Sequence, residues 1–228
     1  RPPVRCRTSS RIFDESRPEV VILIVARYDY LTTISARRGL GVLMTIATPS
    51  TAGAVGMSRS GLYRAARAGR LERIARGVYI PSDAPASDWD LVEAATRRSD
   101  ATICLVSALA HHDLTDTIPD RLDVAIPRGA RPPVTDAAIA WHRFDRSTFD
   151  VGRGTVSVGG TDTEIGLYSP ERCIADAFRL RGLIGYETAR DALKEWLRRG
   201  GRPTSLIEVA ALLPRTRTPI LHALEVLS

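Results

Sequence analysis

Apolar residues recur at helical spacing near the start of the chain. In residues 27–38, Leu31 (or Tyr30), Ile34 and Ala36 fall on one helical face, and Gly39 ends the pattern in the manner of a C-terminal cap. A second pattern begins at residue 48, where threonine suits the N-cap and the following proline suits the first helical position. Two consecutive short helices are therefore predicted.

A third helix is predicted over residues 59–68, between the N-cap candidate Ser58 and Gly69. Only the short turn Gly56-Met57 separates it from the second helix, and two helices joined in this way indicate a helix-turn-helix. Its apolar face contains Leu62, so residues 60, 64 and 67 share the opposite face. That face carries one serine and two arginines. Arginine can contact guanine bidentately and can bind phosphate, but a solvated arginine face is the simpler alternative.

Two apolar stretches, residues 71–74 and 78–80, flank a turn that contains Gly77 and predict a β-hairpin. A hairpin directly after a recognition helix is the wing of a winged helix. Arg73 and Arg76 lie near its tip, where they would reach a phosphate backbone or a minor groove.

The polar, proline-containing stretch 82–87 predicts a linker, and the pattern after it mixes both periodicities. Helices are expected at residues 88–98, 103–112, 170–181, 186–199, 204–213 and 219–227, and strands at residues 122–126, 138–144, 155–158 and 164–168. The predicted fold class is α+β: an N-terminal winged helix-turn-helix, then a larger mixed domain with a central sheet flanked by helices and a helical C-terminus. The predicted boundaries are an extension at 1–26, the DNA-binding domain at 27–81, the linker at 82–87 and the α+β domain at 88–228.

Charge separates the two predicted domains. The 228 residues carry a formal net charge of +6, and Lys194 is the single lysine, a preference for arginine that a GC-rich gene would explain. Residues 1–80 contain 14 arginines and five acidic residues, whereas the remainder has a slight acidic excess. This asymmetry predicts that the basic N-terminal part, residues 1–80, binds a polyanion, and that the remaining residues form a nearly neutral second part, called the body below.

Several function classes lack their signatures. Three scattered cysteines and four histidines give neither a disulfide framework nor metal-ligand spacing. The longest apolar run, residues 20–26, is too short for a membrane helix, so no membrane association and a cytoplasmic location are expected. Neither a phosphate-binding loop nor a nucleophile motif is present in the sequence, so we expect no catalytic residues, no metal and no cofactor.

The polar residues of the body have simple structural interpretations. Arg172 and Asp176 are spaced for an ion pair within one helix. Ser107 is expected to bond to the preceding turn of its helix. His111 and His112 project from different sides of a helix, so they cannot share one metal, and one of them is placed to cap the helix end.

Four stretches together resemble the AbiEi family of antitoxins. They are GMSRSGLYRAARAGRLERIARGVYI (residues 56–80), LVSALAHHDLTDTIPDRLDVAIPRGARPP (105–133), YSPERCIADAFRLRGLIGYETARDAL (168–193) and the helical tail to residue 228. The resemblance covers residues 28–228, and the stretch before residue 28 departs from the family pattern.

The resemblance implies an antitoxin of a type IV toxin–antitoxin operon. Its winged helix would bind double-stranded operator DNA at repeats in its own promoter and repress it, and its C-terminal domain would neutralise a nucleotidyltransferase-like toxin. Together with the helix pattern, it gives these candidate DNA-binding residues: Arg37, Arg38, Ser58, Arg59, Ser60, Tyr63, Arg64, Arg67, Arg73 and Arg76. Two alternatives stay open: a ligand-responsive regulator without a toxin partner, and an enzyme that covalently modifies the toxin.

Overall fold

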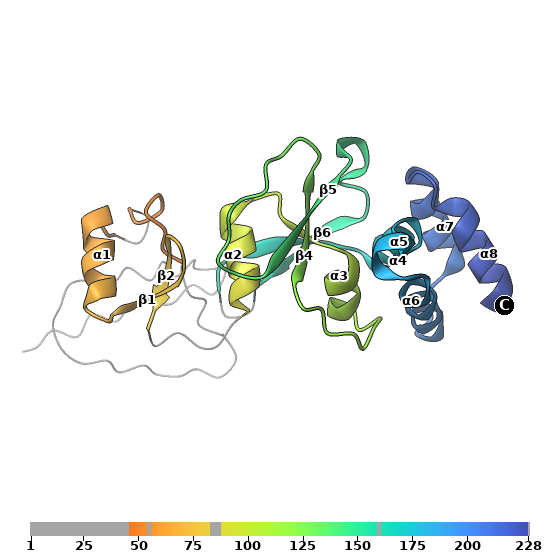
Figure 1. Cartoon of the computed structure of the whole chain (residues 1–228), viewed down its shortest axis with the longest axis horizontal. Helices are drawn as coiled ribbons and strands as arrows, with labels where there is room; N and C mark the ends of the chain where they lie inside the picture. Colours follow the sequence, from red (N-terminus) through yellow and green to blue (C-terminus); the bar gives the residue numbers. More distant parts are fainter. Residues whose placement is uncertain (1–45, 54–55, 83–87, 159–160, 228) are drawn as a thin grey trace, which may run out of the picture. The chain divides into compact units, whose positions relative to one another are not determined.

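The computed structural model describes residues 46–53, 56–82, 88–158 and 161–227 (Figure 1). The expected helix at residues 27–38, with Arg37 and Arg38, lies outside these ranges, as do the extension at 1–26 and most of the linker. The described part is a mixed α+β structure with a two-stranded and a five-stranded sheet. The division into domains stays a prediction.

The first described elements are a short helix and a hairpin. Helix α1 (Arg59–Arg67) is followed by strands β1 (Leu71–Ala75) and β2 (Val78–Pro81), which pair antiparallel with a bulge between Arg73 and Ala75. These three elements match the predicted third helix and hairpin closely.

The expected second helix is not observed in residues 48–53, which form turns instead. The Thr48 hydroxyl does accept a hydrogen bond from the amide of Thr51 at 3.1 Å, as expected of an N-cap, but the Thr51 amide also donates to the Thr48 carbonyl at 3.1 Å, which closes a turn. Glycine at position 53, inside the expected helix, disfavours its continuation. The amide of Met57 then donates to the carbonyl of Ala52 at 2.8 Å and closes the turn.

The larger sheet has the strand order β5-β4-β3-β7-β6. Its strands are β3 (Thr102–Ile103), β4 (Leu122–Pro127), β5 (Ile139–Phe144), β6 (Arg153–Ser157) and β7 (Glu164–Tyr168). The pairs β4–β5 and β3–β7 are parallel, and the pairs β3–β4 and β6–β7 are antiparallel. Four of these strands match the prediction, while β3 lies where sequence reasoning expected a helix to begin.

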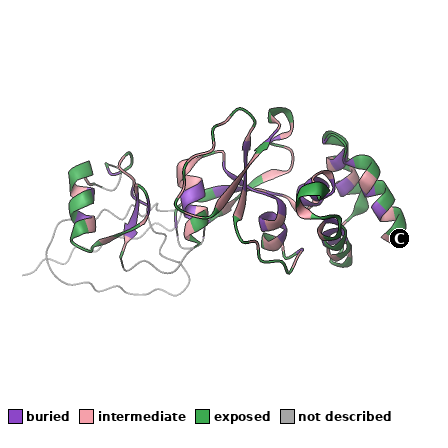
Figure 2. Cartoon of the chain, in the orientation of Figure 1, coloured by how far each residue is buried: buried purple, intermediate pink, exposed green. Residues whose placement is uncertain are grey.

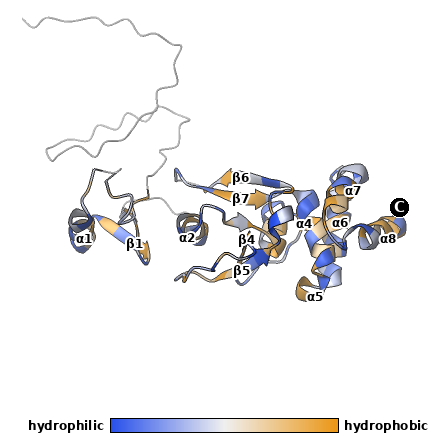
Figure 3. Cartoon of the chain, turned by 90° about the horizontal axis from the view of Figure 1, so that it is seen from above, coloured by the Kyte–Doolittle hydropathy of each residue, from blue (hydrophilic) through white to orange (hydrophobic). Residues whose placement is uncertain are grey.

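Helices supply the rest of the body. They are α2 (Trp89–Arg97), α3 (Leu105–His111), α4 (Pro170–Arg179), α5 (Arg181–Ile184), α6 (Tyr186–Arg198), α7 (Pro203–Leu212) and α8 (Arg217–Leu227), with a 3-10 turn at Arg146–Thr148. Several of them carry hydrophilic and hydrophobic residues on different sides (Figure 3). The expected helix 170–181 is divided, because Leu180 leaves the helical conformation between α4 and α5.

The core joins the sheet to the helices, and buried residues gather in the central strands and in α3 and α4 (Figure 2). Helix α4 packs against α3, α6, α7 and α8 and is buried from Arg172 to Phe178. The predicted ion pair is present inside this core: Nε of Arg172 donates to Asp176 at 2.7 Å, with both side chains buried. The aromatic rings of Tyr168 and Phe144 cover the guanidinium.

The interpretation of Ser107 was wrong. Its hydroxyl donates to the carbonyl of Arg121 and accepts from the amide of Asp123, so it joins α3 to the start of β4. Spacing along a helix reveals only contacts within that helix, whereas this contact depends on the chain returning 14 to 16 residues later.

Candidate nucleic-acid interface

One face of α1 anchors the helix. The Ser58 hydroxyl accepts a hydrogen bond from the amide of Gly61 at 3.0 Å, which caps the N-terminus as predicted. Leu62 is fully buried and clusters with Ala47 and Tyr79. The isolated bridge between Ala47 and Tyr79 fixes β2 beside the chain that precedes α1.

The opposite face of α1 is exposed and basic. Ser60, Arg64 and Arg67 are exposed, and neither arginine side chain has a hydrogen bond or an ion pair within the described residues. Both arginines lie in the last turn, where the helix dipole favours positive charge. The helix therefore presents two uncommitted guanidiniums on a rigid element.

Three other predicted contact residues on or beside α1 have structural contacts as well. Ser58 is used as the cap. Nε of Arg59 donates to the carbonyl of Pro49 at 3.1 Å, which ties α1 to the preceding turn. The half-exposed ring of Tyr63 lies edge-on to the ring of Tyr79, with 6.1 Å between centroids. Replacing any of these three side chains would thus disturb the local fold together with any DNA contact.

The hairpin turn is built around Gly77. Its φ of +77° lies in the left-handed region that glycine adopts without strain. Arg73 and Arg76 flank the tip and are exposed, and Nε of Arg73 donates to the carbonyl of Ala75 at 3.1 Å.

The backbone of Arg76 is held at both its amide and its carbonyl. Its amide donates to the carboxylate of Asp136 at 2.6 Å, and its carbonyl accepts from Nη2 of Arg97 at 2.6 Å. The buried carboxylate of Glu93 binds the same Arg97 and accepts from the amides of Asp136 and Ala137. The hairpin tip is therefore fixed, while the Arg76 side chain is left exposed.

Four arginines line one hollow of about 550 Å³ in this region: Arg59, Arg73, Arg76 and Arg97. Sequence reasoning missed Arg97, since nothing in its local pattern distinguishes it from an ordinary helical arginine. Arg70, exposed just after α1, was missed as well. Residues 46–82 carry six arginines and one acidic residue, Glu72, so the surface is strongly basic. Such a charge density attracts a polyanion.

The described residues offer few other candidate sites. The described residues contain no group of three potential metal ligands. In the same ranges, no helix has the length and apolar character needed to cross a membrane. Nε2 of His112 lies 2.8 Å from the carbonyl of Tyr168, which ties the end of α3 to β7. Burial lowers the pKa of the neighbouring His111, and the adjacent His112 lowers it further.

One comparison with known proteins concerns this region. Residues 44–81 match the family model described as "Transcriptional regulator, AbiEi antitoxin". That match spans the turns, α1 and the hairpin, and ends where β2 ends. It supports a DNA-binding regulatory role for this segment, and it does not extend to the body.

A search of solved structures returned the crystal structure of the RV2827C protein from Mycobacterium tuberculosis. The two chains are 15% identical, the TM-score is 0.40, and the alignment covers 79% of this chain and 90% of that chain. No curated protein matches the sequence.

Proposed function

We propose that residues 27–81 form a winged helix-turn-helix that represses the protein's own promoter. Helix α1 is the recognition helix, and the hairpin β1–β2 is the wing. The observation that carries this proposal is the exposed basic face of α1, where Arg64 and Arg67 have no protein partner within the described residues. The family match over residues 44–81 supports the same assignment.

The roles of the arginines differ in this proposal. Arg64 and Arg67 enter the major groove with Ser60, where a bidentate arginine contact discriminates guanine. Arg73 and Arg76 bind phosphates through the wing, and Arg37 and Arg38 add phosphate contacts from the first predicted helix. One such module makes few base contacts, so repeated operator sites bound by two copies supply the remaining affinity.

We propose further that residues 88–228 neutralise a nucleotidyltransferase-like toxin, as expected for a type IV antitoxin. The sequence resemblance, which continues through residues 105–133 and 168–193, supports this part of the proposal. The proposed separation of DNA binding from toxin neutralisation can be tested, because the proposed DNA-binding side chains of α1 and the hairpin can be replaced without changing residues 88–228.

The decisive experiment is a fluorescence-anisotropy titration with the DNA upstream of the gene and a scrambled duplex, each at two salt concentrations. Wild type should prefer its own upstream DNA. The double variant Arg64→Ala/Arg67→Ala should bind at least about thirtyfold more weakly, because each lost base contact costs about 1–3 kcal/mol. Arg131→Ala/Arg202→Ala removes the same charge from exposed positions of the body and should leave specific binding intact.

Equal losses in both double variants would reduce the interaction to non-specific electrostatics and overturn the recognition helix. The same Arg64→Ala/Arg67→Ala protein, co-expressed with a toxin encoded beside it, should still rescue growth. Loss of rescue together with DNA binding would refute the proposed separation of the two activities.

A further inference from the structure

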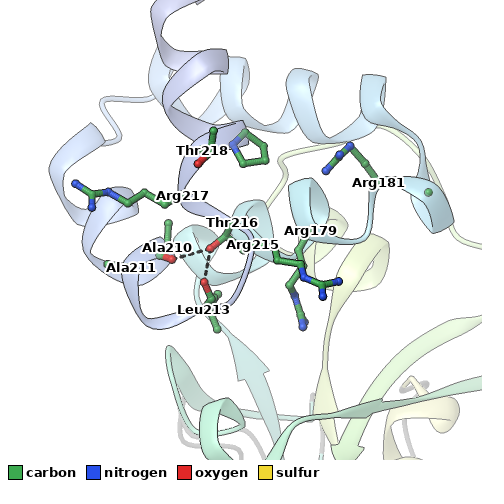
Figure 4. A pocket seen from close by; sticks show the side chains of 11 residues that line it. Arg179, Arg181, Ala210, Ala211, Leu213, Arg215, Thr216, Arg217 and Thr218 are labelled. Carbon is green, nitrogen blue, oxygen red and sulfur yellow. Dashed lines mark hydrogen bonds between the residues drawn. The ribbon is translucent and has the colours of Figure 1, made fainter.

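A second basic site lies in the C-terminal helices, far along the chain from α1. A hollow of about 850 Å³ is lined by residues from the end of α4, from α5 and from the connection between α7 and α8 (Figure 4). Its volume falls in the range of small-molecule sites, about 300–1,000 Å³. The proposed repressor and antitoxin roles do not require this hollow.

The lining of this hollow is basic and contains no acidic residue. Its four guanidiniums belong to Arg179, Arg181, Arg215 and Arg217. Figure 4 shows the guanidinium of Arg181 directed towards the α7–α8 connection, whereas that of Arg217 extends away from the other three. Three guanidiniums from three separate elements therefore remain at the hollow.

These three cations are only partly compensated by the protein. Arg179 donates to the buried carboxylate of Asp176 at 2.7 Å, and Arg181 donates to the carbonyl of Phe178 at 3.0 Å. The Arg215 side chain has no hydrogen bond or ion pair within the described residues. Like charges brought together without counter-charges repel, so an anion in the hollow would be favoured.

The loop that carries Arg215 is held in an unusual conformation. Arg215 has a φ of +62°, a region that costs a non-glycine residue about 1 kcal/mol or more. Next to it, the fully buried hydroxyl of Thr216 lies 2.6 Å from the carbonyl of Ala210 and 2.8 Å from that of Leu213. Glycine would meet the backbone requirement at position 215 without strain, but arginine adds a charge at the rim of the hollow.

We propose that this hollow binds a phosphate-bearing small molecule. Guanidinium groups match phosphate oxygens in geometry and charge, and they stay protonated at all physiological pH values. The three guanidiniums carry more positive charge than a single carboxylate would neutralise. The charge balance therefore favours a ligand with at least two negative charges. The phosphate can come from a free phosphate ester or a diphosphate, and the hollow is large enough for the organic part of a nucleotide.

The test is isothermal titration of the full chain with pyrophosphate at low salt. Wild type should bind it, and Arg181→Ala and Arg215→Ala should each weaken binding at least about tenfold, the loss expected for one charge-assisted contact. Arg179 is left unchanged because its guanidinium holds Asp176. The matched control is Arg202→Ala, which removes one exposed arginine at the start of α7 that does not line the hollow.

The other possible results of these titrations also test the proposal. Absence of pyrophosphate binding, or equal weakening in all three variants, would overturn it. Repeating the titration with a nucleoside diphosphate separates the two phosphate sources: tighter binding than pyrophosphate identifies a nucleotide, and equal binding identifies the phosphate group alone. If Arg181→Ala and Arg215→Ala weaken only the binding of a scrambled DNA duplex, the hollow is a nucleic-acid contact and the small-molecule assignment falls. Because the duplex assay with Arg64→Ala/Arg67→Ala concerns α1, either proposal can fail without the other.

Discussion

Replacing Asp176 by asparagine tests the buried charge network of α4. The Asp176 carboxylate accepts from Nε of Arg172 at 2.7 Å and from Nη2 of Arg179 at 2.7 Å. Arg172 is 0% exposed, and its Nη1 also donates to the carbonyls of Thr148 and Val151. Asp176→Asn keeps the shape of the side chain but leaves the Arg172 charge buried without its counter-charge.

The expected cost follows from burial. Breaking one partner of a fully buried ion pair costs about 3–5 kcal/mol. Because two carbonyls and the Tyr168 ring still stabilise Arg172, we expect the lower end, about 3 kcal/mol, which is roughly a hundredfold in the unfolding equilibrium. With a urea m-value of about 2 kcal/mol/M, the midpoint should fall by about 1.5 M.

Urea denaturation followed by circular dichroism measures this shift, and a surface pair supplies the control. Arg190 and Asp191 form an ion pair with side chains 44% and 61% exposed, so Asp191→Asn should change stability by no more than about 0.5 kcal/mol. The double variant Arg172→Met/Asp176→Leu removes both charges and should be more stable than Asp176→Asn. Equal midpoints for Asp176→Asn and Asp191→Asn would refute the assignment of a buried, mutually dependent charge pair.

Three more predictions follow from the described contacts. Glu93→Ala should lower the free energy of unfolding, measured in urea, by about 1–3 kcal/mol, because the amides of residues 136 and 137 and the Arg97 guanidinium lose their acceptor. Glu93→Gln should lower it less, and an equal loss in both variants would contradict the hydrogen-bonding role of Glu93. Ser58→Ala should destabilise α1 by about 1 kcal/mol, seen as faster hydrogen exchange at the Gly61 amide, and unchanged exchange would contradict the cap. Burial raises the pKa of the Cys104 and Cys173 thiols well above the usual range. Peptide mapping after maleimide treatment at pH 8 should therefore find both thiols labelled only in denaturant. Labelling in the native protein would show that these thiols are accessible.

Patterns that act within one segment could be predicted from the sequence. The helix α6, the strand β7 and the hairpin follow from periodicity and from turn residues that are local in the chain. The Arg172–Asp176 pair was predictable for the same reason, since both residues lie on one helix. The basic face of α1 also follows directly from residue spacing.

Features set by distant parts of the chain could not be predicted. The apolar run at residues 103–112 looks like one helix, yet its first residue, Ile103, pairs with β4 and β7 and forms the strand β3 together with Thr102. Glu93 looks like a solvent-facing helical glutamate, but residues 136 and 137 return to cover it. The arginine-lined hollow likewise depends on α4, α5 and the α7–α8 connection meeting in space.

The shortest strand of the larger sheet also restricts which sequences this fold can accept. β3 is two residues long and pairs with Gly166 on β7, and a methyl group at position 166 would lie within 2.8 Å of the Thr102 hydroxyl, the Ala101 carbonyl and the Arg153 guanidinium. The Ala101 carbonyl is backbone, and the Thr102 hydroxyl is already bonded to Nε of Arg153 at 2.8 Å, so neither can move aside cheaply. A substitution at position 166 would therefore force β7 away from β3, the two-residue strand that joins the pair β4–β5 to the pair β6–β7. Among natural relatives that keep this sheet, position 166 should tolerate no residue but glycine, however far the surrounding strands diverge.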